Sequence, residues 1–125
     1  MDKEHFASTI DVWPTLAALL NTETPSGLPG VNLADAKAVA SRTAIFGEQY
    51  RHNIADVDAP TRSLENRWII AGDWKLIVPN PKNLPNEKPK LYKVSIDPWE
   101  KQDLDEAEPE RVQRLTRQLD KWWQP

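Results

Sequence analysis

The feature that most constrains the fold is the segment RWIIAGDWKLIVP, residues 67–79. Two apolar runs flank Gly72-Asp73, and a two-residue turn that begins with glycine joins antiparallel strands, because glycine accepts a positive φ. Period-2 alternation groups the large side chains of each strand on one face. These are Trp68 and Ile70 in the first strand, and Trp74, Leu76 and Val78 in the second. Lys75 points the other way. We therefore predict a hairpin with one strongly apolar face, which needs a cover.

Two further short strands and a helix complete this part of the chain. Arg42 to Tyr50 and Leu91 to Val94 have strand character. Residues 108–123 form an amphipathic helical pattern with Pro109 in the first turn, acidic residues near the start and basic residues further along, as the helix dipole favours. We predict an α+β fold, with a small antiparallel sheet of about four strands covered by a C-terminal helix.

The N-terminal region predicts a second helix that has no assigned partner. In STIDVWPTLAALLN, residues 8–21, Asp11 is a candidate N-cap, Pro14 suits the first turn and Asn21 can adopt the left-handed turn that ends a helix. A short strand is expected over residues 6–10, and an extended loop rich in Pro and Gly follows the helix. The unpartnered apolar side of this helix indicates that it packs against something outside the predicted sheet.

Composition limits the possible functions. The chain has 125 residues, which suits a single domain, and six Trp, which compensate for a hydrophobic fraction of only 39%. The net charge of −3 indicates no broad attraction to nucleic acid or to a membrane, so we expect neither as a partner. The absence of Cys excludes disulfides and cysteine nucleophiles. The N-terminal MDKEHF has no apolar signal-peptide region, and no run is long enough to span a bilayer.

Candidate chemical groups are few. The carboxylates between Asp97 and Glu106 lack the spacing of a calcium loop, and Asp-Pro starts turns, so we interpret them as structural. His5 and His52 are far apart and form no metal-binding pattern. Arg51 and His52 are the candidate binding residues, because they open a polar loop, residues 51–65, directly after a strand. A solvated loop is the alternative for this pair.

Five segments between Thr9 and Trp122 carry a family pattern: IDVWPTLAALLN, GLPGVNL, FGEQYRH, RWIIAGDWKLI and LYKVSIDPWEKQDL. In this order they resemble the C-terminal end of a formylglycine-dependent sulfatase of the alkaline-phosphatase-like superfamily, of the N-sulfoglucosamine sulfohydrolase or arylsulfatase type. The features shared with the family include the Asp-x-x-Pro-Thr-Leu helix and the Asp-Pro-x-Glu signature. Lys93, Asp103 and Asn21 depart from the usual family residues, all at the edges of elements.

The resemblance implies that residues 1–125 form one sulfatase C-terminal subdomain. Residues 1–21 would be a remnant strand and helix of the domain junction, with the helix packed on a missing α/β domain, and residues 42–123 the sheet and C-terminal helix. In this family the Cys that becomes formylglycine and the residues that hold calcium lie in the larger N-terminal domain. We therefore carry no catalytic or metal-binding residue over to this chain, and we expect no cofactor within it. Family members are often periplasmic, secreted or lysosomal.

The predicted function is that of the C-terminal part of a sulfatase, a sulfuric ester or sulfamate hydrolase. By this resemblance the subdomain completes the substrate pocket, is inactive alone and has the N-terminal domain as its partner. Arg51 and His52 would contact a sulfated carbohydrate, since a guanidinium binds sulfate oxygens with two donors. Two alternatives stay open: a stand-alone module that binds sulfated carbohydrate through Arg51, His52 and Trp99, and the non-catalytic half of a split sulfatase.

Overall fold

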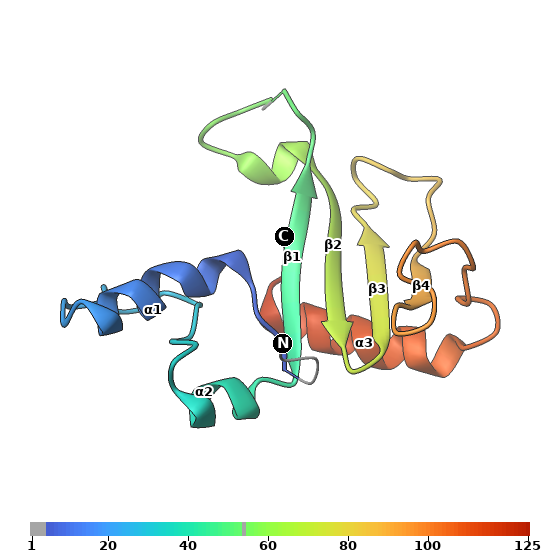
Figure 1. Cartoon of the computed structure of the whole chain (residues 1–125). Helices are drawn as coiled ribbons and strands as arrows, with labels where there is room; N and C mark the ends of the chain where they lie inside the picture. The colour runs from blue at the N-terminus through green and yellow to red at the C-terminus, as the bar shows by residue number, and fades with distance from the viewer. Residues whose placement is uncertain (1–4, 54) are drawn as a thin grey trace. The chain divides into compact units, whose positions relative to one another are not determined.

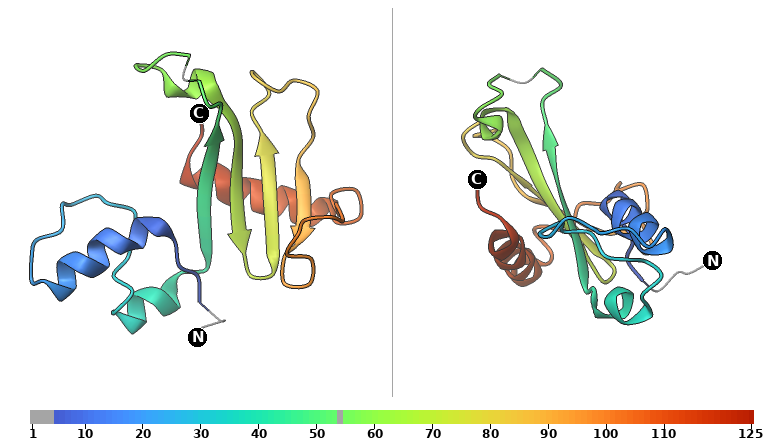
Figure 2. Two further views of the ribbon diagram at one scale, coloured as in Figure 1. Left: turned by 45° about the horizontal axis from the view of Figure 1, so that its top comes forward. Right: turned by 90° about the vertical axis from the view of Figure 1, so that its left-hand side faces the viewer.

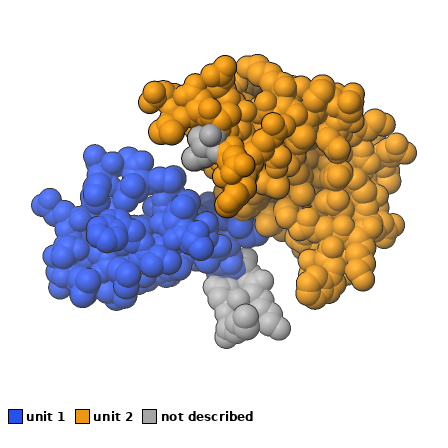
Figure 3. All heavy atoms as spheres, turned by 90° about the horizontal axis from the view of Figure 1, so that it is seen from above, with its two compact units in different colours: residues 1–45 blue, residues 46–125 orange. Residues whose placement is uncertain are grey.

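The structure, a computed structural model, describes residues 5–53 and 55–125 and divides into two compact units, Met1–Ile45 and Phe46–Pro125 (Figure 3). Residues 1–4 of the predicted N-terminal segment and residue 54 of the predicted polar loop lie outside the described residues. No helix in the described part of the chain is both long and apolar enough to cross a membrane.

The first unit begins with the predicted helix, which is shorter than expected. A 3-10 turn, η1 (Thr9–Asp11), leads into α1 (Val12–Leu19), where Pro14 lies in the first turn. The strand expected over residues 6–10 does not form, because its last two residues are part of η1. Asn21 adopts a φ of 52°, which confirms the left-handed turn expected after the helix.

A short helix that the sequence analysis missed, α2 (Ala36–Ser41), follows the long loop of this unit. The Asp35 side chain caps it by accepting hydrogen bonds from the backbone N–H groups of Lys37 and Ala38. The loop itself passes very close to the start of α1. A Cβ at Gly30 would lie 2.1 Å from the carbonyl oxygen of Ile10, so only glycine fits there.

A four-stranded antiparallel sheet forms the centre of the second unit, with β1 beginning in the last two residues of the first (Figure 1). The strands lie side by side in sequence order: β1 (Ala44–Tyr50), β2 (Leu64–Ala71), β3 (Trp74–Pro79) and β4 (Lys90–Lys93). Gly72 has a φ of 56° in the turn between β2 and β3, as predicted for this hairpin. The predicted α+β class and the number of strands are confirmed.

The C-terminal helix α3 (Pro109–Trp122) lies across one face of this sheet (Figures 1 and 2). Arg67 identifies the covered face, because it donates hydrogen bonds to Asp120 and to the carbonyl oxygen of Trp123 at the end of α3. Fully buried apolar residues form the core of this unit: Leu64, Ile69, Leu76, Leu91, Leu115 and Leu119. Phe46 of β1 stacks on Trp122, with ring centroids 5.1 Å apart.

The two groups of apolar residues in the hairpin lie on opposite faces of the sheet, which corrects the single apolar face expected from the sequence. The two-residue turn pairs Ala71 with Trp74 and therefore Trp68 with Ile77, so Trp68 and Leu76 point to opposite sides. Trp68 covers Gly47 of β1, where a Cβ would lie 2.3 Å from the indole ring. Both faces of the sheet are therefore packed with apolar side chains.

Candidate functional site

The loop between β1 and β2 carries the predicted binding residues and is fixed at its base. Ser63 is buried at the end of the 3-10 turn η2 (Pro60–Ser63). Its carbonyl oxygen accepts a hydrogen bond from the backbone N–H of Arg51 at 2.8 Å. Its hydroxyl accepts one from the backbone N–H of Ala55 at 2.7 Å. Arg62 forms an ion pair with Asp56 at 2.9 Å. The two ends of the loop are thus held together by one serine.

Arg51 and His52 both lie on the surface of the second unit. The Arg51 side chain is 51% exposed, with Nε 3.5 Å from a carboxylate oxygen of Glu65 and Nη2 donating to the carbonyl oxygen of Asn83 at 3.3 Å. A guanidinium has five N–H donors, so others remain free for a ligand. His52 is exposed, and its ring has no hydrogen bond or ion pair within residues 5–53 and 55–125. No hydrogen bond or cation–π contact joins these two side chains, both of which lie in the described part of the chain.

A hollow of about 530 Å³ begins beside Asn83, the residue whose carbonyl oxygen accepts the Arg51 hydrogen bond. Seven residues line it: Ala55, Thr61, Arg62, Asn80, Lys82, Asn83 and Pro125. The Asn83 amide donates to the carbonyl oxygens of Leu64 and Thr61, and the Asn80 amide donates to Leu64. These asparagines anchor one wall of the hollow to the start of β2.

The sequence analysis missed this wall, because Asn80 and Asn83 lie in a segment whose repeated prolines indicate only a loop. Arg62 and Lys82 add two positive charges to the lining. With Arg51 nearby, the hollow offers cationic donors to an anionic ligand. Its volume is in the range of small-ligand pockets.

A buried ion pair organises the first unit. Asp11 is fully buried and accepts two hydrogen bonds of 2.6 Å from the Arg42 guanidinium, in a bidentate arrangement. It also accepts from the backbone N–H groups of Val31 and Ser8, at 2.9 and 2.7 Å. Burial alone would raise the pKa of Asp11, but the hydrogen bonds from Arg42, Val31 and Ser8 outweigh it and lower the pKa to about 2.

This arrangement corrects the role expected for Asp11. The residue stands at the N-cap position of α1, but its side chain makes no cap hydrogen bond to that helix. It instead joins the start of α1, the long loop and the end of α2, because Arg42 directly follows α2. The two partners are 31 residues apart, and no local pattern predicts that they pair.

The carboxylates after β4 bind backbone groups and a lysine. An Asp97 oxygen accepts from the N–H of Gln102 at 2.9 Å, and this bond is the main reason why the pKa of Asp97 is lowered. Asp103 accepts from the N–H of Leu91 at 3.0 Å, and Glu100 pairs with Lys75 at 2.6 Å. In the described part of the chain, no group of three or more His, Asp or Glu side chains has the arrangement of a metal site.

Comparisons with known proteins give matches only among solved structures. No protein-family model and no curated protein matches the sequence. A structure labelled 6S-sulf, from work on the metabolism of glycosaminoglycans by Bacteroides thetaiotaomicron, is 26% identical with a TM-score of 0.56. That match covers 89% of this chain and 24% of the other.

Two further solved structures share the fold at 20% identity. Ps i-CgsB, in complex with k-i-k-neocarrahexaose, has a TM-score of 0.65 over 94% of this chain and 24% of its own. A protein in complex with its substrate D-glucosamine-2-N,6-O-disulfate has a TM-score of 0.63, over 89% of this chain and 22% of its own. The chain thus spans about a quarter of the length of the structures it matches. The prediction from the five sequence segments is confirmed: the chain is similar to sulfatases and has the α+β fold of a sulfatase C-terminal subdomain.

Proposed function

We propose that the chain acts as the C-terminal part of a sulfatase that hydrolyses sulfuric esters or sulfamates of carbohydrates. The observation that carries this proposal is the 26% identity to a 6S-sulf structure over 89% of the chain. The chain contributes structure and part of the substrate pocket. Catalysis is performed by a larger domain, which by family resemblance contains formylglycine and calcium.

The exposed apolar side chains of the first unit support such a partner domain. Five large residues of α1 and its C-terminal end are about half exposed or more: Val12, Trp13, Leu16, Leu19 and Leu20. Apolar surface of this density on one short helix is typical of an interface. We infer that this side of α1 packs on the larger domain, in agreement with the sequence-based prediction that residues 1–21 belong to the domain junction.

Arg51 and His52 are proposed to contact the sulfated sugar, together with the hollow beside Asn83. Free donors of Arg51 and the cations Arg62 and Lys82 are suited to sulfate oxygens, which accept bidentate hydrogen bonds from guanidinium groups. The saccharides in two of the matched structures, a neocarrahexaose and a glucosamine disulfate, support this ligand class.

A chimera tests the proposal. This chain replaces the matching quarter of the 6S-sulf protein, and sulfate release from a 6-O-sulfated glucosamine is measured. The double variant Arg51→Ala with His52→Ala should raise KM about tenfold, because it removes charge-assisted hydrogen bonds to the substrate. The control Lys101→Ala with Gln102→Ala removes a cation and a polar neighbour from another exposed loop, and should leave KM unchanged. Equal effects of the two double variants would reject the assigned contact.

The isolated chain separates this function from that of a stand-alone binding module. As part of an enzyme, the chain alone releases no sulfate from 4-nitrophenyl sulfate and binds glucosamine 2-N,6-O-disulfate weakly. The hollow lined by cations is the observation in favour of a stand-alone binding module. That alternative is supported if the isolated chain binds this sugar tightly and the Arg51 and His52 double variant does not. Isothermal titration calorimetry measures the Kd of the wild-type chain and of the double variant for this sugar. Co-expression with the remaining part of the 6S-sulf protein tests the split-enzyme arrangement.

A further inference from the structure

Helix α3 carries four cationic side chains along its length, Arg111, Arg114, Arg117 and Lys121, which we call the cation row. Successive members are three, three and four residues apart, which makes each the helical neighbour of the next. Like charges at these spacings destabilise a helix, and the row is unexpected in a chain whose net charge is −3. At 1.5 Å per residue the row is about 15 Å long.

The central members of this cation row, Arg114 and Arg117, have no anionic partner among the residues that the structure describes. Arg111 is held by Glu108 at 3.1 Å and lies 4.1 Å from the ring centroid of Trp74. Arg114 and Arg117 are exposed, and their side chains form no ion pair or hydrogen bond within residues 5–53 and 55–125. Glu110, four residues before Arg114, makes no ion pair with it in this part of the chain.

Local neutralisation therefore does not explain the row. The carboxylate of Asp120, three residues after Arg117, already binds Arg67 at 3.0 Å. The helix dipole favours cations only in the last turn, which accounts for Lys121 but not for Arg114, the sixth of fourteen helical residues. Two guanidinium groups in the middle of α3 thus repel each other without compensation from within the described chain.

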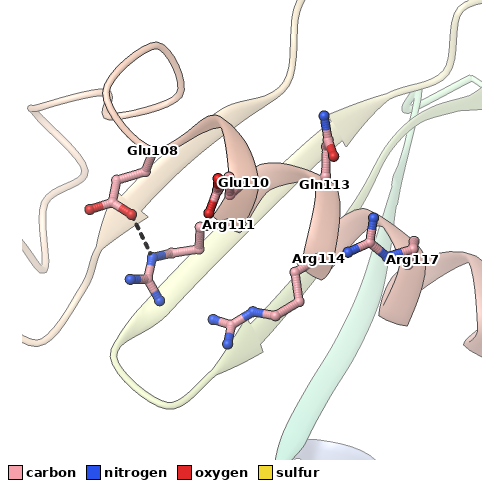
Figure 4. Close-up of a pocket in the computed structure, with 6 residues that line it drawn as sticks. All are labelled: Glu108, Glu110, Arg111, Gln113, Arg114 and Arg117. Carbon is pink, nitrogen blue, oxygen red and sulfur yellow. Dashed lines mark hydrogen bonds and ion pairs between the residues drawn. The ribbon is translucent and has the colours of Figure 1, made fainter.

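Three members of the cation row, Arg111, Arg114 and Arg117, help to line a shallow hollow of about 510 Å³ on the outer side of α3 (Figure 4). Six residues line it: Glu108, Glu110, Arg111, Gln113, Arg114 and Arg117. Arg111 and Arg114 extend in the same direction in Figure 4, and Arg117 extends towards Arg114. The lining combines three guanidinium groups, one amide and two carboxylates, of which Glu108 is already paired with Arg111. None of these residues belongs to the hollow beside Asn83.

We propose that the cation row of α3 is a docking surface for an extended sulfated polysaccharide, formed by residues other than Arg51 and His52. The inference rests on the proposed function, from which the ligand class follows. Guanidinium groups bind sulfate oxygens through paired donors, and a line of sulfates relieves the repulsion along the helix. A single line of charge about 15 Å long suits a strand.

The test uses the purified full chain and a size-defined heparin oligosaccharide, with Kd measured by isothermal titration calorimetry. The double variant Arg114→Gln with Arg117→Gln should bind about tenfold more weakly and with a shallower salt dependence, since two ion contacts are lost. The control Lys88→Gln with Lys101→Gln removes the same charge from two exposed loop positions and should bind as the wild type does. Arg114→Lys with Arg117→Lys keeps the charge but loses the paired donors, and its affinity should lie between those of the wild type and the Gln double variant.

Three results would overturn the assignment. They are no binding by the wild type, an equal loss in the control, and tighter binding to a DNA duplex or to phosphatidylserine vesicles than to the oligosaccharide. Circular dichroism establishes that the variants are folded, and at the same concentration heparin should raise the Tm of the wild type more than that of the Gln double variant. An inactive chimera together with intact heparin binding would reject the proposed function and leave docking on α3 standing. An active chimera with no heparin binding would do the reverse.

Discussion

The buried pair of Asp11 and Arg42 should determine the stability of the first unit, and the variant Arg42→Ala tests this. The substitution removes both 2.6 Å hydrogen bonds and leaves the Asp11 carboxylate buried without a counter-charge. Removal of one partner from a buried pair costs about 3–5 kcal/mol. Val31 and Ser8 still donate to Asp11, which places the expected loss near the lower end, at about 3 kcal/mol.

The pH dependence gives an independent magnitude. The pKa of Asp11 falls from 3.8 to about 2 in the folded protein, which corresponds to about 2 kcal/mol of stability. Because the folded pKa is depressed, this stability is fully present above pH 3.8 and is lost as the pH falls towards 2. In Arg42→Ala the pKa of Asp11 rises, so acidification destabilises the variant less than the wild type.

Hydrogen exchange of the backbone amides of residues 8–42, followed by mass spectrometry, measures the effect within the first unit. The Arg42→Ala variant should exchange about a hundredfold faster at neutral pH, as expected for a loss of about 3 kcal/mol in opening free energy. Arg42→Lys keeps the charge but loses the bidentate geometry, and should lie between the two. Lys37→Ala on the exposed side of α2 is the control. Less than a threefold change in Arg42→Ala, or an equal change in the control, would refute the assigned role.

Three other predictions concern the second unit. Gly47→Ala should lower the free energy of unfolding by about 1–3 kcal/mol, because its Cβ would meet the Trp68 ring, and Trp68→Phe should restore part of the loss in urea denaturation. Asp97→Ala should lower the Tm by releasing the N–H of Gln102, without changing calcium binding in calorimetry; a selective loss of calcium binding would contradict the structural role. Burial and nearby carboxylates raise the pKa of Tyr92, so stability should fall as the pH rises past 10; Tyr92→Phe should remove that part of the alkaline loss.

The sheet and C-terminal helix were predictable because their patterns are local. Gly72-Asp73 defines the hairpin within two residues, and the stripe of Leu115 and Leu119 defines the buried side of α3. The distribution of Trp68 and Leu76 between the faces was not predicted, because it depends on the register that the turn imposes.

The interactions between distant segments were less predictable. Asp35 directly before an Ala-rich run is an N-cap signal that was sufficient to predict α2. The prediction missed this helix because the preceding Pro and Gly residues indicate a loop. No local pattern joins Asp11 to Arg42, or Asn83 to the start of β2, because those contacts form only when the chain folds back on itself. Arg51 and His52 stay a prediction for substrate contact, with the geometry of Arg51 now defined by Glu65 and Asn83.

Sulfate release by the chimera tests the central claim most directly. The 6S-sulf protein with its matching quarter replaced by this chain is compared with the same protein lacking that quarter, both loaded with calcium and containing formylglycine. A sulfatase C-terminal subdomain should give a folded chimera with measurable kcat/KM on a 6-O-sulfated glucosamine, where the shortened protein has none. The same test is made with this chain covalently joined to the shortened protein and with the two co-expressed as separate chains. If both forms fold with formylglycine in place and neither releases sulfate, the account is contradicted.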